Sequence, residues 1–261
     1  MTLWQGLCHL PTSWHPPMGR LLGKFLLIVA KDRKKIAQAN ISLCLSNLSA
    51  DDQKKILSNN FALLGKSIIE TGIAWFWSDA KIEKFIDYEI FGLDLLSIEN
   101  STKGNLIIFK HSQHLELDAR LLAINAEVYG VSRSHNSASM NKIQNKGRLS
   151  SIKGTADKDN PRKFIKWLKN GKNVLYAIDQ DYGWDNSAKL KFFNQETATI
   201  TTPKKIIDIT GSNLLFMNSY YEKNKIVLKL EALNSFGIDN KGLSQKINDF
   251  MEEKILLHPA E

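Results

Sequence analysis

The sequence predicts one α/β domain, with a central mixed β-sheet flanked by helices and an N-terminal helix that associates with a membrane. Short apolar runs alternate with segments of helical periodicity along the chain, which is typical of α/β folds. The 261 residues are 43% hydrophobic and 24% charged, which favours one sizeable core over a disordered chain. An apolar segment near the N-terminus ends in a basic run. We therefore expect residues 1–35 to form a membrane-associating segment, a truncated anchor, and residues 36–261 to form the domain.

The N-terminal segment is apolar between residues 18 and 30 and basic between residues 31 and 35. About a dozen apolar residues is too short to span a bilayer, which needs roughly 20. The basic start and small-residue cleavage site of a signal peptide are absent. We therefore expect this segment to lie on a membrane interface. The aromatic residues 75–77 offer a second lipid contact or core packing, and both interpretations stay open.

The remaining elements follow from periodicity and capping residues. A helix begins at Ala50-Asp51-Asp52 and runs towards Trp75, and another begins at Asn160-Pro161 and is stopped by Gly171. Strands are expected at residues 105–109, 128–132, 174–178 and 214–220, a hairpin at 220–233 and a closing helix at 243–257.

Charge indicates the kind of partner. The chain has 35 basic and 27 acidic residues, for a net charge of +8, and therefore favours anionic partners. Ten basic residues lie between Lys142 and Lys172, either as a solvated face or as a surface for lipid phosphates, acidic headgroups or an acidic carrier protein. No nucleic-acid-binding motif accompanies them, so no nucleic-acid partner is expected. Cys8 and Cys44 give no disulfide framework and favour a reducing compartment.

The best catalytic candidates are His111 and Glu116, spaced as His-x4-Glu directly after an apolar run. Residues five apart on one helix point about 140° from each other. If a strand ends at Phe109 and a helix begins near Ser112, however, His111 lies on the turn and the Glu116 carboxylate can reach back to it. A histidine held by a carboxylate is a general base near neutral pH.

Asp179 is a further candidate because it also follows an expected strand. Ligands of open α/β sheets bind outside the carboxyl ends of strands, so both His111 and Asp179 fall where a site is expected. His114 and Asp118 form an i, i+4 pair that fits a solvated helix face or, together with His111, a cluster that resembles a metal site. We expect no metal there, since the spacing matches no zinc motif, and no calcium after Asp179, where the loop lacks the required glycine and glutamate.

Four separated motifs resemble the late, Kdo-dependent lipid A acyltransferases, which belong to the lysophospholipid acyltransferase-like superfamily. These motifs are His111 to Arg120, Ala74-Trp75-Phe76-Trp77, Gly147-Arg148, and Tyr176-Ala177-Ile178-Asp179-Gln180-Asp181-Tyr182-Gly183. They occur in the family's order, and the resemblance extends from about Trp4 to Glu261.

The resemblance implies an acyltransferase domain that transfers a fatty acyl chain from an acyl carrier protein thioester to a hydroxyl of a 3-hydroxyacyl chain. The acceptor would be a Kdo-lipid IVA-type precursor at the cytoplasmic face of a bacterial inner membrane. Carried over by position, His111 is the catalytic base and Glu116 its carboxylate partner, while Arg148 and Asp179 bind substrate. No cofactor or metal is implied. A fixed cation such as Arg148 suits the negative charge that develops on the thioester carbonyl.

The chain departs from the family pattern at three places. The family's N-terminal membrane-spanning helix is expected to be present only in its later part, interrupted by prolines, and the family's tail is expected beyond residue 261. The turn at residues 133–138 lacks the usual prolines. Two alternatives therefore remain: an acyltransferase for another glycolipid or a glycerophospholipid, and a catalytically inactive, membrane-peripheral remnant.

Overall fold

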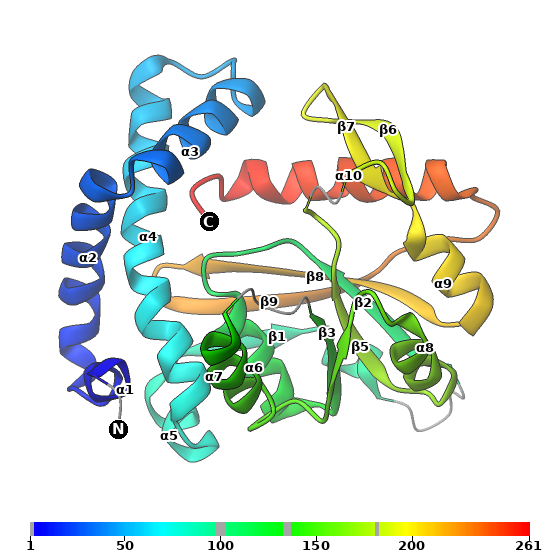
Figure 1. Ribbon diagram of the computed structural model, residues 1–261, viewed down its shortest axis with the longest axis horizontal. Helices are drawn as coiled ribbons and strands as arrows, with labels where there is room; N and C mark the ends of the chain where they lie inside the picture. The colour runs from blue at the N-terminus through cyan, green and yellow to red at the C-terminus, as the bar shows by residue number, and fades with distance from the viewer. Residues whose placement is uncertain (1–2, 98–102, 133–136, 181–182) are drawn as a thin grey trace.

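The computed structural model describes residues 3–97, 103–132, 137–180 and 183–261, and its centre is a twisted sheet with helices on both faces (Figure 1). The sheet is mixed, as predicted: β8 and β9 pair antiparallel and the other neighbouring strands pair parallel. In spatial order its strands are β1 (Tyr88–Phe91), β9 (Lys225–Ala232), β8 (Asn213–Glu222), β2 (Asn105–Phe109), β5 (Asn173–Ala177), β3 (Val128–Ser132) and β4 (Thr155–Asp157).

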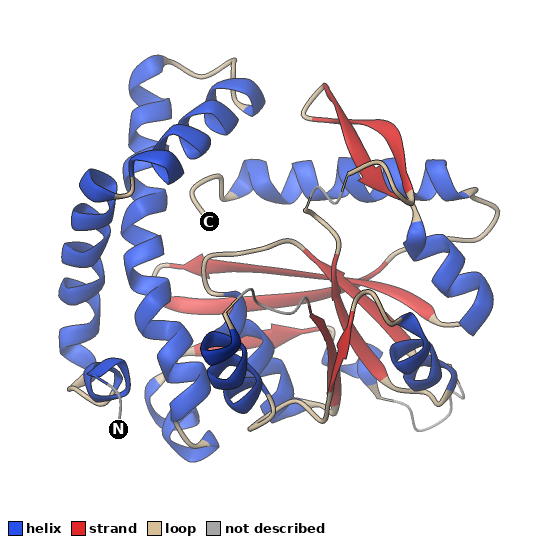
Figure 2. Cartoon of the chain, in the orientation of Figure 1, coloured by secondary structure: helices blue, strands red, loops and turns tan. Residues whose placement is uncertain are grey.

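Two helical layers cover the sheet (Figure 2). Strand β2 shows why: Ile107 and Phe109 belong to one apolar core, and Leu106 and Ile108 to the other, because successive side chains of a strand point to opposite faces. The first core packs beneath α4 (Ala50–Phe76), α5 (Asp79–Phe85), α6 (Leu115–Asn125) and α7 (Ala138–Arg148). The second packs beneath α8 (Pro161–Lys169), α9 (Thr202–Thr210) and α10 (Asn240–Leu257).

Most predicted elements are confirmed, with small shifts at their ends. The bounds of β2 and β3 agree with the sequence, β5 begins one residue earlier than expected, and α10 begins three residues earlier. The long helix α4 is capped by Ser49, whose hydroxyl accepts the backbone N–H of Asp52. The sequence did not predict the separate hairpin of β6 (Ser187–Phe192) and β7 (Gln195–Ile200), which packs on α10. Two short 3-10 helices complete the fold, Thr12–Trp14 and Leu93–Leu96.

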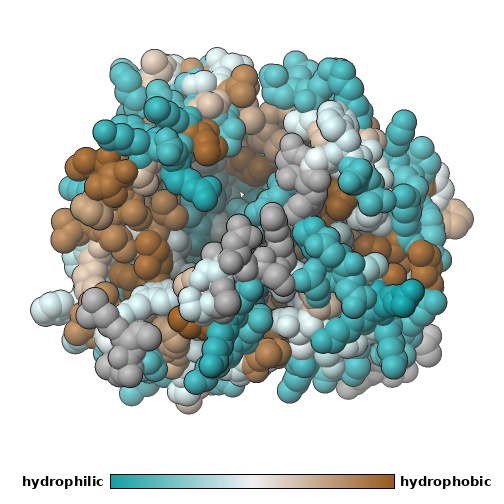
Figure 3. Space-filling model, in the orientation of Figure 1, coloured by the Kyte–Doolittle hydropathy of each residue, from teal (hydrophilic) through white to brown (hydrophobic). Residues whose placement is uncertain are grey.

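The N-terminal helices α1 (Leu3–Cys8), α2 (His15–Val29) and α3 (Lys31–Cys44) lie along α4. Helix α2 approaches α4 closely because glycines line the contact: a Cβ on Gly23 would lie 2.3 Å from the Phe61 carbonyl oxygen, and one on Gly65 would lie 2.1 Å from the Gly19 carbonyl oxygen. Apolar side chains gather on this side of the molecule (Figure 3). Within the described residues, no helix is both long and apolar enough to cross a membrane.

Candidate active site

The register of two neighbouring strands brings His111 and Asp179 together. Strands β2 and β5 are parallel, and Phe109 pairs with Ala177, so the residues two positions further along each strand emerge side by side at the carboxyl edge of the sheet. The imidazole Nδ1 of His111 lies 2.5 Å from Oδ1 of Asp179, and the backbone N–H of His111 donates to Oδ2 at 2.6 Å. The same aspartate thus fixes both the ring and the backbone of His111.

This contact determines which ring nitrogen of His111 is free to accept a proton. An ionised carboxylate only accepts hydrogen bonds, so Nδ1 carries the hydrogen. The side-chain amide of Gln180 faces the other nitrogen, Nε2, at 3.3 Å, which suits an unprotonated acceptor. The His111 side chain is 37% exposed and lines the main pocket. This arrangement is that of a general base oriented by a carboxylate.

Glu116 has different partners from those expected. Its carboxylate accepts the indole N–H of Trp75 at 2.8 Å and the Nε–H of Arg148 at 3.1 and 3.2 Å, and it forms a second contact with Arg148 Nη2. Among the residues that the structure describes, no hydrogen bond or ion pair joins Glu116 to His111, so the predicted pairing is wrong. Helix α6 begins only at Leu115 and packs against α4, and the Glu116 side chain reaches Arg148 at the end of α7.

A pocket of about 580 Å³ lies between His111 and the Glu116–Arg148 pair, and all three residues line it. Much of its wall is apolar and comes from the sheet, α4, α6 and the loop after α7: Trp75, Phe109, Leu115, Val131, Ile152 and Leu175. Polar and charged side chains form much of the rest of the lining, among them Arg120, Gln144, Thr155, Lys158, Asp159 and Asp185. A cavity that combines apolar walls with convergent polar groups is the usual form of a ligand site.

Arg148 is held firmly enough to act as a fixed cation in this pocket. Its Nε and Nη2 atoms contact the carboxylate of Glu116, while Nη1 makes no hydrogen bond to any described residue. The side chains of Arg148 and Glu116 are only 22% and 16% exposed. A preorganised guanidinium at low exposure stabilises negative charge more strongly than one in water.

A second histidine, His114, is sealed inside the protein. Its Nδ1 lies 2.6 Å from Oδ1 of Asp118, whose other oxygen accepts the hydroxyls of Ser112 and Ser219. Burial lowers the pKa of His114, but the charge of Asp118 and hydrogen bonds to Asp118 and Glu261 outweigh burial and raise this pKa to about 9. We infer that His114 is protonated at neutral pH and forms a buried ion pair rather than a base for substrate.

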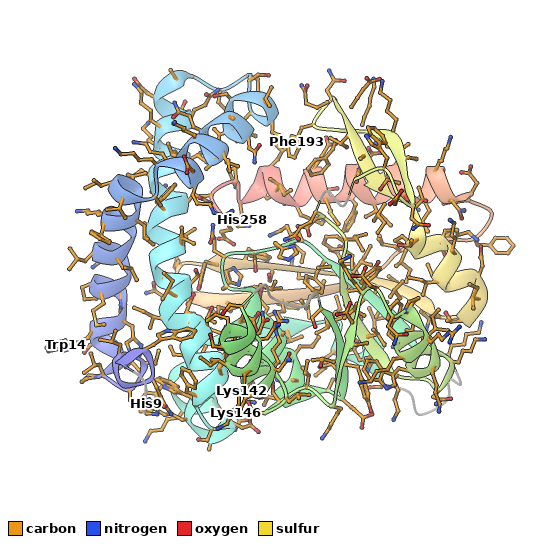
Figure 4. All side chains as sticks on the ribbon, in the orientation of Figure 1. His9, Trp14, Lys142, Lys146, Phe193 and His258 are labelled. Atoms are coloured by element: carbon orange, nitrogen blue, oxygen red, sulfur yellow. The ribbon has the colours of Figure 1, made fainter. Side chains whose placement is uncertain are left out.

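The remaining sequence candidates have plainer positions. Trp75 and Trp77 are 8% and 4% exposed, so the core interpretation of the aromatic run is correct. Lys142 and Lys146, from the basic run, project from the outer side of α7 (Figure 4). No group of three or more metal-ligating side chains lies together in the described parts of the chain.

Sequence reasoning missed the contribution of Trp75 and Gln180 to the site. Trp75 was considered only as a core or lipid contact, although it lies within the motif Ala74-Trp75-Phe76-Trp77 and now proves to contact Glu116. Gln180 follows Asp179 directly, and its place just after an expected strand could have marked it as a site residue. Residues 133–136, which include most of the atypical turn, lie outside the described residues.

The family model for bacterial lipid A biosynthesis acyltransferases matches residues 1–261. Among curated proteins, the lipid A biosynthesis palmitoleoyltransferase of Escherichia coli K12 is 29% identical over 250 residues, which cover 94% of this chain and 81% of that protein. The lipid A biosynthesis lauroyltransferase of the same strain is 34% identical over 186 residues, covering 71% and 60% of the two chains. A lipid A biosynthesis acyltransferase of Haemophilus influenzae is 33% identical over 204 residues, covering 77% and 65%.

Proposed function

Because the chain belongs to the bacterial lipid A biosynthesis acyltransferase family, we propose that it transfers a fatty acyl chain from acyl carrier protein to a Kdo-lipid IVA-type precursor. The family match and the names of the relatives support acyl transfer in lipid A biosynthesis. The carrier-protein thioester as donor, and the hydroxyl of a 3-hydroxyacyl chain as acceptor, are the finer parts of the proposal.

The observation that carries the proposal is His111, held by Asp179, at a pocket lined by both apolar and polar side chains. Nε2 of His111 takes the proton of the acceptor hydroxyl as its oxygen attacks the thioester carbonyl, and Asp179 holds the ring and stabilises the imidazolium that forms. Collapse of the tetrahedral intermediate breaks the C–S bond, and the imidazolium returns the proton to the departing thiolate. An ester and a free carrier thiol result, without a covalent acyl-enzyme.

Arg148 supplies the positive charge that this intermediate needs. The carbonyl oxygen becomes negative during attack, and the Nη1 group of Arg148 is the part of the guanidinium that Glu116 does not occupy. In this proposal Glu116 orients Arg148, whereas Asp179 orients His111. All four residues predicted from the sequence keep a role, but Asp179, expected to bind substrate, takes the place of Glu116 as the partner of His111.

We further propose that α2 holds the protein on the cytoplasmic leaflet of the inner membrane. Leu21, Phe25 and Ile28 are 57–72% exposed and follow one another at helical spacing on the side away from Gly19 and Gly23. Trp14 projects outward at the same edge of the molecule (Figure 4), and exposed basic residues flank the stripe. Apolar side chains beside cations favour an anionic lipid surface.

The deciding experiment is lipid mass spectrometry after expression in bacteria that lack their own late acyltransferases. The proposal predicts that lipid A gains the mass of one fatty acyl group with the wild-type protein and none with His111→Ala. A gain on another glycolipid or on a glycerophospholipid would instead support a different acceptor. Binding to anionic vesicles without transfer from any acyl donor would support the inactive remnant.

A further inference from the structure

Trp75 contacts the carboxylate of Glu116 and packs on Gly147, the residue before Arg148, although it lies on a different helix from either. We propose that Trp75 is a positioning residue for acyl transfer, which holds the Glu116 carboxylate and the Arg148 guanidinium in the pocket wall. The inference rests on the proposed function, since it assigns Trp75 a role in that same site.

The first contact is a hydrogen bond to the carboxylate. The indole N–H of Trp75 donates to Oε2 of Glu116 at 2.8 Å, the same oxygen that accepts the Nε–H of Arg148 at 3.1 Å. With Arg148 as its sole partner, the Glu116 carboxylate could still rotate out of the plane of the guanidinium. A second donor, approaching from α4, restricts the position of Glu116 and through it the direction of Nη1.

The second contact is between the indole ring and the backbone of α7. A Cβ on Gly147 would lie 2.4 Å from Cγ of Trp75, so the ring packs directly on the glycine that precedes Arg148. Gly147 does not have a positive φ, and the reason for glycine is therefore space rather than backbone conformation. The ring consequently sets how closely the last turn of α7 approaches α4.

Trp75 can serve this purpose because it is itself held in place. It is 8% exposed, and the ring of Trp4 packs edge-on against it with centroids 5.4 Å apart and planes at 68°. Trp4 in turn donates its indole N–H to the carbonyl of Ile68 on α4 at 2.9 Å. The side chains that connect α1 to Arg148 are Trp4, Trp75 and Glu116, and each of them is at least partly buried and held by a neighbour.

Trp77 provides a matched control for Trp75. It is a second buried tryptophan, 4% exposed, whose N–H donates to the carbonyl of Cys8 at 2.9 Å, and it does not line the pocket. Replacing either residue by phenylalanine removes one indole N–H and part of one ring from the same core. A purely structural role predicts the same consequence at both positions.

The test compares Trp75→Phe and Trp77→Phe in Tm, kcat and KM for the lipid acceptor. We expect similar losses in Tm, but kcat lower by about 10-fold to 100-fold in Trp75→Phe only, the equivalent of one hydrogen bond to a charged group. KM should stay within about 3-fold of the wild type, because a group that acts in the transition state changes kcat. Equal losses of kcat in the two variants, or no loss in Trp75→Phe, would overturn the inference.

A double-mutant cycle with Glu116→Ala shows whether the effect runs through the carboxylate. When Glu116 is absent, Trp75→Phe should lower kcat by less than about 3-fold further, because coupled residues are not additive. A full additional loss would contradict the proposed route. If Trp75→Phe does not fold, benzothienylalanine at this position replaces the N–H by sulfur within the same ring outline and tests the same expectation.

An inactive wild-type protein would refute the proposed function. An active wild-type protein, with equal losses of kcat in Trp75→Phe and Trp77→Phe, would refute the role of Trp75 alone.

Discussion

Two histidines that lie three residues apart in this chain each pair with an aspartate, and the two pairs differ mainly in their surroundings. His111 and Asp179 are 37% and 17% exposed and His111 lines the pocket, whereas His114 and Asp118 are both 0% exposed. The nitrogen–oxygen distances are nearly equal, 2.5 and 2.6 Å. The two contacts are therefore alike in geometry, and access to substrate and solvent separates a base from a structural ion pair.

The difference in exposure between the two pairs follows from where each histidine lies relative to the sheet and to α6. His111 lies on the turn after β2, opposite the end of β5, while His114 immediately precedes α6 and is covered by Tyr221 and Glu261. A buried ion pair adds little to stability relative to an apolar core, but removal of one partner leaves an uncompensated charge. Variants of the two aspartates should therefore have opposite phenotypes.

Asp179→Asn should give the largest effect, and it should affect activity. The amide no longer holds the imidazole in the tautomer with a free Nε2, nor stabilises the imidazolium, so the transfer rate should fall by about 1,000-fold or more. The Tm should change by only a few degrees, because Asp179 lies at the surface of the sheet edge. Initial rates and thermal unfolding on the same preparation check this; a rate within tenfold of the wild type would remove Asp179 from the mechanism.

Asp118→Asn should instead affect stability. It takes away the nearer carboxylate of the protonated His114 and leaves only Glu261, 3.4 Å from Nε2; loss of one partner of a buried pair costs about 3–5 kcal/mol. Denaturant unfolding measures this loss. Glu196→Gln serves as a control, because the Lys189–Glu196 pair is 61% and 65% exposed and such pairs contribute about 1 kcal/mol or less. Equal effects of the two substitutions would show that His114 is not a buried cation.

Alkaline pH should weaken the fold through His114. Its pKa is about 9 in the folded protein against 6.5 for the free side chain, so the folded state binds its proton more tightly. The resulting stability is fully present below about pH 6.5 and is lost as pH rises through 9, roughly 3 kcal/mol in all. Unfolding free energies between pH 6 and 10 test this expectation. The difference between wild type and His114→Gln should shrink across that range, and a constant difference would contradict the assignment.

Gln180→Ala should have the smallest effect. The amide faces Nε2 of His111 at 3.3 Å and occupies the direction from which an acceptor hydroxyl must approach. Its removal takes away a competing donor, so we expect a change in rate of less than about fivefold, seen in KM for the acceptor. A loss comparable to that of Asp179→Asn would mean that Gln180 takes part in the proton transfer.

The fold was predictable where apolar runs are continuous. All five residues of β2 are buried, and such a run between turn residues identifies a strand. The β6–β7 hairpin was missed although residues 187–192 alternate strictly between polar and apolar side chains, which is a strand signal. It is held by contacts far away in sequence, such as those of Gln245 and Asn248 on α10 with the backbone of Lys191.

The site was predictable in its members but not in its pairing. His111 and Asp179 each follow an expected strand, so the sequence placed both at the same edge of the sheet. That β2 and β5 are neighbours depends on strand order, which periodicity does not report. Glu116 was chosen as the partner of His111 because it is close in sequence, yet the orientation of α6 directs its carboxylate to Arg148.

The most direct measurement is the initial rate of acyl transfer by purified His111→Ala beside His114→Gln, each at a temperature where it is fully folded. We predict that His111→Ala loses at least about 1,000-fold, the usual contribution of a general base with its orienting partner, while His114→Gln stays within about tenfold of the wild type. Transfer by His111→Ala within tenfold of the wild type, or a greater loss in His114→Gln, would contradict the assignment of the base.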